Sequence, residues 1–214
     1  MKSNFLKLAL GATLSIAAFS ASAQKTYTEG VATYSLKTAA GEAESKVSFR
    51  GDSSCSSSQY GPAQVKLITN AKGTSFVILV DVPVASMKKA AILTPDEIDQ
   101  AAAAAPKFTF TPTTETKEIS GFNCKKVQVK DPKSGVSFDA WVTNDVSAPQ
   151  NLMTKYFDGA GGFPVQFTTI QQGQQVGVVL KSISAEKVPA GTFGIPAGFD
   201  HITLEELNSM RGNN

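Results

Sequence analysis

Hydrophobic and polar residues alternate along most of the chain beyond residue 24. In the segment 44–51, Val47 and Phe49 fall on one side of an extended chain, and Ser48 and Arg50 fall on the other. This period of two is typical of a β-strand with one buried face. The segment 74–82 is apolar on both sides, which predicts a central strand. The pattern predicts about nine strands, at 30–37, 44–51, 63–70, 74–82, 107–111, 121–130, 135–143, 163–170 and 174–184. Because no strand–helix–strand spacing repeats, we expect an antiparallel sheet.

Two segments interrupt this pattern with helix signals. Thr94-Pro95-Asp96-Glu97 is a capping box with proline at the first helical position, and the alanine-rich helix that follows should stop at Pro106. A second helix is expected at 148–157, with Leu152 and Tyr156 on one side. A short C-terminal turn follows His201, and we expect residues 208–214 to fray.

The segment 121–142 predicts a hairpin with one of the two cysteines and the only tryptophan. Asp131-Pro132-Lys133-Ser134-Gly135 has proline and glycine where a tight turn requires them. Trp141 alternates with Phe138 and therefore lies on the opposite face of its strand. Two interpretations remain open for Trp141: it covers the sheet beneath a helix, or it forms an aromatic wall of a ligand cavity.

The N-terminus resembles an export signal. Lys2 and Lys7 give a positively charged start, and an apolar run follows from about Leu8 to Phe19. Ala21-Ser22-Ala23 then has the small-x-small form of a cleavage site. We therefore expect a cleaved signal peptide at 1–23, a single domain at 24–207, and a periplasmic or secreted protein. No cysteine follows the cleavage site, which argues against a lipid anchor. Removing residues 1–23 would leave 18 basic and 18 acidic residues, a balance that disfavours nucleic acid as a partner.

Cys55 and Cys124 are an even pair in a chain predicted to be exported, so they are a candidate disulfide. If they were bridged, the loop between them would give about 4 kcal/mol of stabilisation. The alternative is two unrelated thiols, with Cys55 in a serine-rich turn and Cys124 buried in a strand.

Catalytic and metal-binding patterns are weak in this sequence. Gly51-Asp52-Ser53 resembles the nucleophile block of GDS-type hydrolases, but no aspartate stands three residues before His201 as that family requires. One histidine and two distant cysteines predict no metal site. We expect no enzyme activity and no cofactor, and we keep a hydrolase that uses Ser53 and His201 as the least favoured hypothesis.

Two segments resemble a known exported bacterial family. Gly121-Phe122-Asn123-Cys124-Lys125-Lys126, followed by Trp141-Val142-Thr143, is similar to its hairpin, and 188–199 is similar to its C-terminal motif. This family is domain of unknown function 4412, which is similar to the periplasmic lipoprotein carriers and receptors LolA and LolB. The resemblance implies a mainly β (α+β) fold: a curved, unclosed antiparallel barrel around an apolar cavity, with two or three short helices on or over it.

Two functional hypotheses follow. In the first, the protein is a monomeric envelope protein that binds a lipid or another apolar ligand in the concave face of the sheet. A cavity of this kind removes about 25 cal/mol of unfavourable hydration per Å² of apolar surface. The cavity candidates are Trp141, Phe138, Phe76 and Phe167. In the second, the interior is filled, and the protein is a structural module that binds an envelope protein partner.

Overall fold

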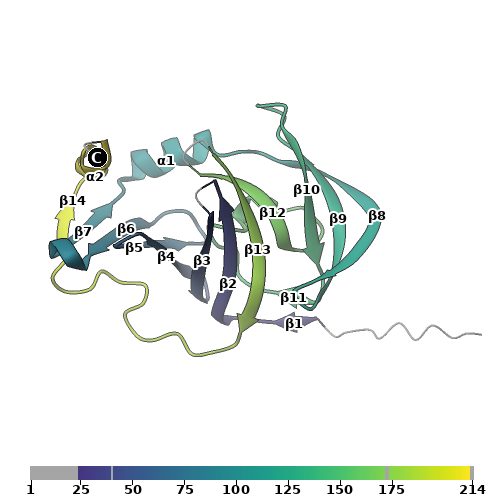
Figure 1. Ribbon diagram of the computed structural model, residues 1–214, viewed down its shortest axis with the longest axis horizontal. Helices are drawn as coiled ribbons and strands as arrows, with labels where there is room; N and C mark the ends of the chain where they lie inside the picture. Colours follow the sequence, from purple (N-terminus) through teal and green to yellow (C-terminus); the bar gives the residue numbers. More distant parts are fainter. Residues whose placement is uncertain (1–23, 40, 172–173, 213–214) are drawn as a thin grey trace, which may run out of the picture.

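One large curved sheet forms most of the molecule (Figure 1). The computed structural model describes residues 24–39, 41–171 and 174–212, so the predicted signal peptide at 1–23 lies outside the described residues. The described part contains a twelve-stranded sheet in the order β14-β7-β6-β5-β4-β3-β2-β13-β12-β10-β9-β8. Every pair is antiparallel except β14 with β7. The expected mainly β fold with an unclosed antiparallel sheet is confirmed.

The first half of the sheet, which we call the open half, is a meander of strands that pair in chain order. Tight turns connect them, and at Gly51 and Gly61 the backbone has a φ of 56°, which glycine adopts without strain. The meander consists of β3 (Gly41–Arg50), β4 (Ser53–Tyr60), β5 (Ala63–Asn70), β6 (Phe76–Val82) and β7 (Met87–Ile92). The open half also includes the short edge strand β14 (Asp200–Ile202), which comes from far along the chain and pairs in parallel with β7. A short 3₁₀ turn, η1 (Pro83–Ala85), lies at the tip of the β6–β7 hairpin.

Strand β4 corrects the prediction of a serine-rich turn around Cys55. Ser54, Ser56 and Ser58 share one face of β4 and are buried. Their hydroxyls find partners on neighbouring strands: Ser45 lies 3.2 Å from Ser56 and 2.9 Å from Ser58. Such cross-strand hydrogen bonds satisfy small polar side chains inside a sheet. The pairing of β4 with β3 and β5 thus overrides the weak strand preference of serine.

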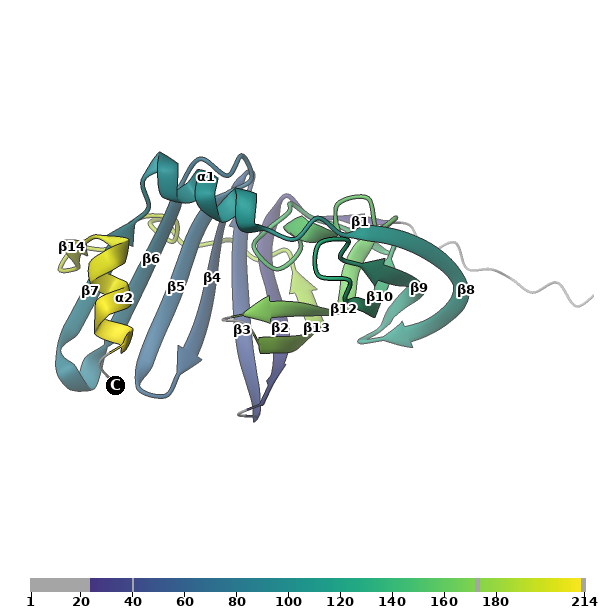
Figure 2. The same cartoon turned by 90° about the horizontal axis from the view of Figure 1, so that it is seen from above.

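The second half, which we call the curled half, bends around a compact core (Figure 2). The predicted turn at Asp131–Gly135 is confirmed, since the amide of Gly135 donates to the carbonyl of Asp131 at 2.8 Å. A two-stranded parallel ribbon, β1 (Lys25–Thr26) with β11 (Val146–Ser147), lies beside this half. The curled half consists of β2 (Glu29–Thr38), β8 (Thr109–Ile119), β9 (Phe122–Lys130), β10 (Ser137–Thr143), β12 (Phe163–Gln171) and β13 (Gln174–Ser184).

Of the two predicted helices, the first forms and the second does not. Helix α1 (Pro95–Ala104) begins with the predicted capping box. The segment 148–157 forms turns and only a short 3₁₀ helix, η2 (Lys155–Phe157). Here the Asn151 side chain accepts from the amide of Met153 at 2.9 Å, a local bond that competes with helix formation. None of the described helices is long and apolar enough to cross a membrane.

The chain end is ordered further than expected. Helix α2 (Leu204–Gly212) includes residues 208–212, which were predicted to fray. A second capping box explains this, because Thr203 and Glu206 exchange hydrogen bonds at 2.7 and 3.1 Å. The backbone amide and the hydroxyl of Thr203 both donate to the Glu206 carboxylate, and these bonds lower the pKa of Glu206.

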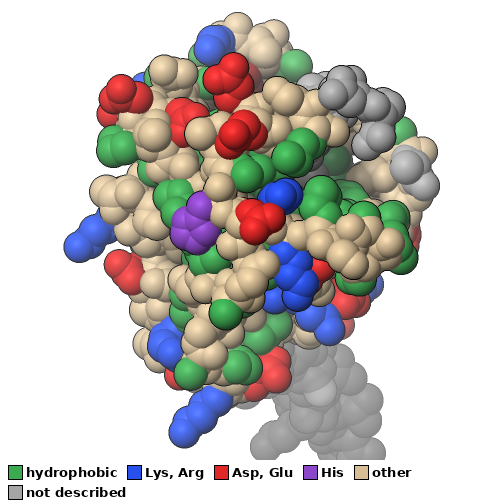
Figure 3. All heavy atoms as spheres, turned by 90° about the vertical axis from the view of Figure 1, so that its left-hand side faces the viewer, with side chains coloured by type: hydrophobic (Ala, Val, Ile, Leu, Met, Phe, Trp, Pro, Cys, Tyr) green, Lys and Arg blue, Asp and Glu red, His purple; other side chains and the backbone are tan. Residues whose placement is uncertain are grey.

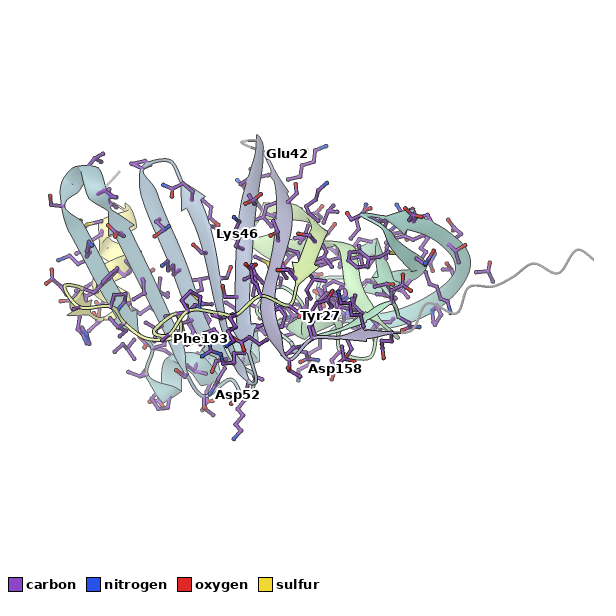
Figure 4. The ribbon with its side chains drawn as sticks, turned by 90° about the horizontal axis from the view of Figure 1, so that it is seen from below. Tyr27, Glu42, Lys46, Asp52, Asp158 and Phe193 are labelled. Carbon is purple, nitrogen blue, oxygen red and sulfur yellow. The ribbon has the colours of Figure 1, made fainter. Side chains whose placement is uncertain are left out.

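Residues 185–199, which we call the strap, run under the open half and close its outer face. Figure 4 views the molecule from this side and shows Phe193 on the strap where it crosses the strands. The strap is fastened to β2 and β3 by Glu29, which accepts from the amide of Val188 at 2.8 Å and from Arg50 at 3.0 Å. These two bonds hold the pKa of Glu29 below its usual value. Arg50 also donates to the carbonyl of Val188.

Candidate functional site

The inner face of the sheet is continuous from one half to the other. Residues that pair directly across antiparallel strands point to the same side. One row of such pairs runs along this face and comprises Ala32, Val47, Ser56, Leu67, Ile78 and Ala91. Both helices lie on this side of the sheet, with α1 across the strands of the open half and α2 against β7 (Figures 1 and 2).

In the curled half the inner face is filled by aromatic side chains. Phe157 of η2 projects into the curve, and its ring centroid lies 4.5 Å from that of Phe167 and 5.8 Å from that of Phe108. Phe108 also packs edge-on against Phe138 at 5.4 Å. A hollow of about 20 Å³ bordered by Phe108 and Phe138 is too small for an acyl chain. The turns at 148–157, where a helix was predicted, therefore place Phe157 inside the curve and fill it.

The structure does not bring the four cavity candidates together. Phe138 and Phe167 belong to this aromatic core. Trp141 lies on the outer, convex face of β10, opposite to Phe138, and the ammonium of Lys117 stands 4.0 Å from its ring. Neither interpretation of Trp141 describes this position, because a lysine and not a helix or a ligand wall lies over it. Phe76 is in the open half, on the inner face.

The open half differs because the two faces of its strands are covered unequally. On the outer face the side chains under the strap are buried, as for Ile68 at 5% and Leu79 at 2% exposure. On the inner face of the same two strands the apolar side chains are only half-buried. We call this inner surface the trough, and it comprises Val65, Leu67, Phe76, Ile78 and Val80.

The borders of the trough follow from its neighbours in the sheet. Toward the curled half lies the buried hydroxyl strip of β3 and β4, which contains Ser45, Ser56 and Ser58. Toward the edge lies β7, on which α2 packs with Leu207 buried. Beside Val80, Lys89 is ion-paired with Asp200 at 2.8 Å, which keeps the pKa of Asp200 low. Figure 3, which faces this edge, shows basic and acidic side chains among hydrophobic ones.

Tyr34 of β2 lies between the hydroxyl strip and the filled core. It pairs with Ser45 across β2 and β3 and is fully buried. Its hydroxyl has no hydrogen-bond partner at normal geometry, although the Asn151 side chain lies near enough to influence it. Burial raises the pKa of Tyr34 above its usual value.

Cys55 and Cys124 are both free thiols, so the structure does not form the candidate disulfide. Five strands separate β4 from β9 in the sheet, and the two residues belong to different cores. A bridge requires Cα atoms within about 7 Å of each other. Burial raises the pKa of Cys55, and burial together with nearby Asp145 raises the pKa of Cys124 to about 11.

The residues that the sequence suggested for catalysis lie far apart. Ser53 is on β4 and His201 on β14, with three strands between them. The described residues contain no group of three or more His, Cys, Asp or Glu side chains arranged to hold a metal ion. A polar cavity of about 260 Å³ lies apart from the trough and is bordered by Gln24, Asn144, Asp158, Gly159, Gly161 and Gly162.

The trough could not be recognised from the sequence alone. Its residues show the same alternation as fully buried strands, and the strap that covers only one face is more than a hundred residues away in the chain.

Comparison with curated proteins finds no matching relative. The model of the family described as Domain of unknown function (DUF4412) matches residues 28–199, from the start of β2 to the end of the strap, and the chain therefore belongs to this family.

Proposed function

We propose that the protein binds an apolar or amphipathic, lipid-like ligand in the trough. The observation that carries the proposal is the unequal covering of β5 and β6. Ile68 and Leu79 are buried on one face, whereas Leu67 and Ile78 on the other remain half-exposed. Apolar side chains left in contact with water on central strands favour association with an apolar partner.

The resemblance to the LolA and LolB carriers supports the same class of function. In such a carrier, a concave sheet removes acyl chains from water. Here Phe157 fills the curled half, so the proposed binding surface is confined to the open half. We assign no cargo protein to it. We also propose that residues 1–23 direct export to the envelope, which mass determination of the N-terminus of the exported protein would test.

A chain-length series tests the binding proposal. Saturated fatty acids of increasing length are titrated against the protein, and displacement of a fluorescent apolar probe is measured. Each methylene that enters the trough should contribute about 0.8 kcal/mol, or about fourfold in affinity, until the trough is filled. Tryptophan emission should stay constant, because Trp141 lies on the convex face.

The variant Leu67→Asp places a charge in the trough and should weaken binding at least tenfold. Val84→Asp is the matched control, because Val84 is 84% exposed at the β6–β7 tip, outside the trough. Fatty acids that fail to displace the probe from the wild type, or equal affinities for the two variants, would contradict the proposal. Mass spectrometry of lipids extracted from natively purified protein identifies the natural ligand.

A further inference from the structure

Gln24 lies at the border of the polar cavity, together with Asn144, Asp158 and the glycine-rich turn that follows η2. Its side chain is exposed, and it forms no hydrogen bond or ion pair with another residue that the structure describes. Gln24 is also the first residue after the expected cleavage site at Ala21-Ser22-Ala23. Cleavage there would make Gln24 the amino terminus of the exported protein and place the new α-amino group beside this cavity.

The residues directly after Gln24 are held in place. The amide of Lys25 donates to the carbonyl of Asp145 at 2.8 Å. The amide of Tyr27 donates to the carbonyl of Ser147, also at 2.8 Å, and the Tyr27 side chain is buried. These bonds fasten β1 along β11 (Figure 1). The new terminus would therefore be a single unpaired residue on a fixed strand.

An N-terminal glutamine carries a nucleophile and an electrophile in one residue. The α-amino nitrogen attacks the δ-carbonyl carbon of the side chain and forms a C–N bond. The bond from this carbon to the side-chain amide nitrogen breaks, and that nitrogen leaves as ammonia with one proton from the amine. The product is a five-membered lactam, and no further reactant is needed. Because an α-amino group has an ordinary pKa of about 7.7–8.0, part of the population is the reactive free amine at neutral pH.

The surroundings of Gln24 favour ring closure over retention of a charged terminus. The side chain must fold back over its own backbone, and no described residue holds it extended. The cavity of about 260 Å³ leaves space on one side. Among the described residues that border this cavity, Asp158 is the only ionisable one, and it could pair with a terminal ammonium. Because Asp158 is exposed, such a pair would be weak and reversible, whereas the release of ammonia is irreversible.

From these observations we infer that Gln24 is a modification site, at which the mature amino terminus cyclises to pyroglutamate beside the polar cavity. The inference rests on the export cleavage proposed above. Ring closure removes the terminal positive charge from the cavity border. It also removes the free amine that aminopeptidases require, so the mature terminus should resist them.

The test is the intact mass and the N-terminal sequence of the full chain, expressed with residues 1–23 and purified from the exported fraction of a bacterial host. The wild type should be lighter than the chain 24–214 by one molecule of ammonia. It should give no N-terminal sequence until a pyroglutamyl peptidase removes the ring. Gln24→Glu is the matched control: the side chain has the same length, but its ionised carboxylate is a poor electrophile. This variant should keep its full mass.

A second measurement tests whether the fold leaves Gln24 free to react. A protease releases the chain that begins at Gln24 from a fusion protein, and the loss of ammonia is followed in buffer and in urea. The rates for the folded and the unfolded protein should agree within about threefold.

If the exported chain begins at a residue other than Gln24, the proposed cleavage fails. If it begins with unmodified Gln24, or if the folded protein cyclises more than tenfold more slowly than the unfolded chain, only the present inference is overturned.

Discussion

The two halves of the sheet show the same alternation of apolar and polar residues, but their inner faces are covered differently. In the curled half, Phe157 and Phe167 close the inner face, and Val165 and Val178 are fully buried. In the open half, the strap fills the outer face while the trough on the inner face stays half-exposed. The difference shows that curvature alone does not create a binding surface. Whether a face of the sheet stays open depends on whether a segment from elsewhere in the chain covers it.

The largest expected effect comes from removing the Phe157 side chain, which fills the curled half. Phe157→Ala should lower the free energy of unfolding by about 3–5 kcal/mol, because it opens a cavity in a closed core. Phe76→Ala in the trough should cost less than half as much, since Phe76 is only half-buried. Urea-induced unfolding of both variants measures this. Equal losses would contradict the distinction between a filled and an open half.

A smaller effect is expected between β2 and β13 of the curled half. A Cβ at Gly30 of β2 would lie 2.0 Å from the carbonyl oxygen of Ser184, so Gly30→Ala should destabilise by about 1–3 kcal/mol. At Gly177 of β13 the nearest atom is 3.6 Å away, in ordinary contact. Gly177→Ala should therefore be neutral or stabilising by up to about 1 kcal/mol. Thermal unfolding of the two variants measures the difference, and equal stabilities would contradict the close approach of β13 to Gly30.

Tyr34→Phe should raise stability by about 1 kcal/mol, because the variant no longer buries a hydroxyl without a partner. It should also change the response to alkaline pH. Folded Tyr34 keeps its proton above pH ~10, where the unfolded chain loses it, so rising pH favours unfolding of the wild type. Denaturation at pH 8 and pH 11 should show a smaller alkaline loss for Tyr34→Phe. A less stable variant at pH 8 would mean that the hydroxyl has a partner.

The smallest effect is expected at helix α1. Thr94→Ala removes the cap of α1, worth about 1 kcal/mol to the helix itself. Because α1 buries no residue, global stability should change by less than about 0.5 kcal/mol, while hydrogen exchange of its amides should accelerate. The matched change Thr203→Ala in α2, where Leu207 is buried, should lower global stability by about 1 kcal/mol. Equal global losses would show that α1 packs more firmly than its exposure indicates.

Local patterns in the sequence were sufficient to predict most strands, helix α1 and the turn at Asp131–Gly135. These elements depend on alternation, caps and turn residues that lie close together in the chain. Strand β4 was missed because serine has a weak strand preference, and its burial depends on partners in β3 and β5. The capping box at Thr203–Glu206 was a readable signal that would have extended α2.

The sequence did not indicate which part of the sheet forms the candidate site. Phe76 was identified and lies in the trough, whereas Phe138 and Phe167 became core. Which inner surface stays open depends on two segments, η2 and the strap, whose docking is a long-range event. Alternation along one strand carries no information on what later covers each of its faces.

The strand order has a consequence for how an emerging chain folds. Strands β2 to β7 each pair with the next in sequence, so this meander needs no later part of the chain. The other side of β2 pairs with β13, about 140 residues further on. Until β13 arrives, β2 presents an unpaired strand edge, where another chain could add by mistake. We therefore expect a chaperone that delays premature association to matter most during the synthesis of residues 93–173.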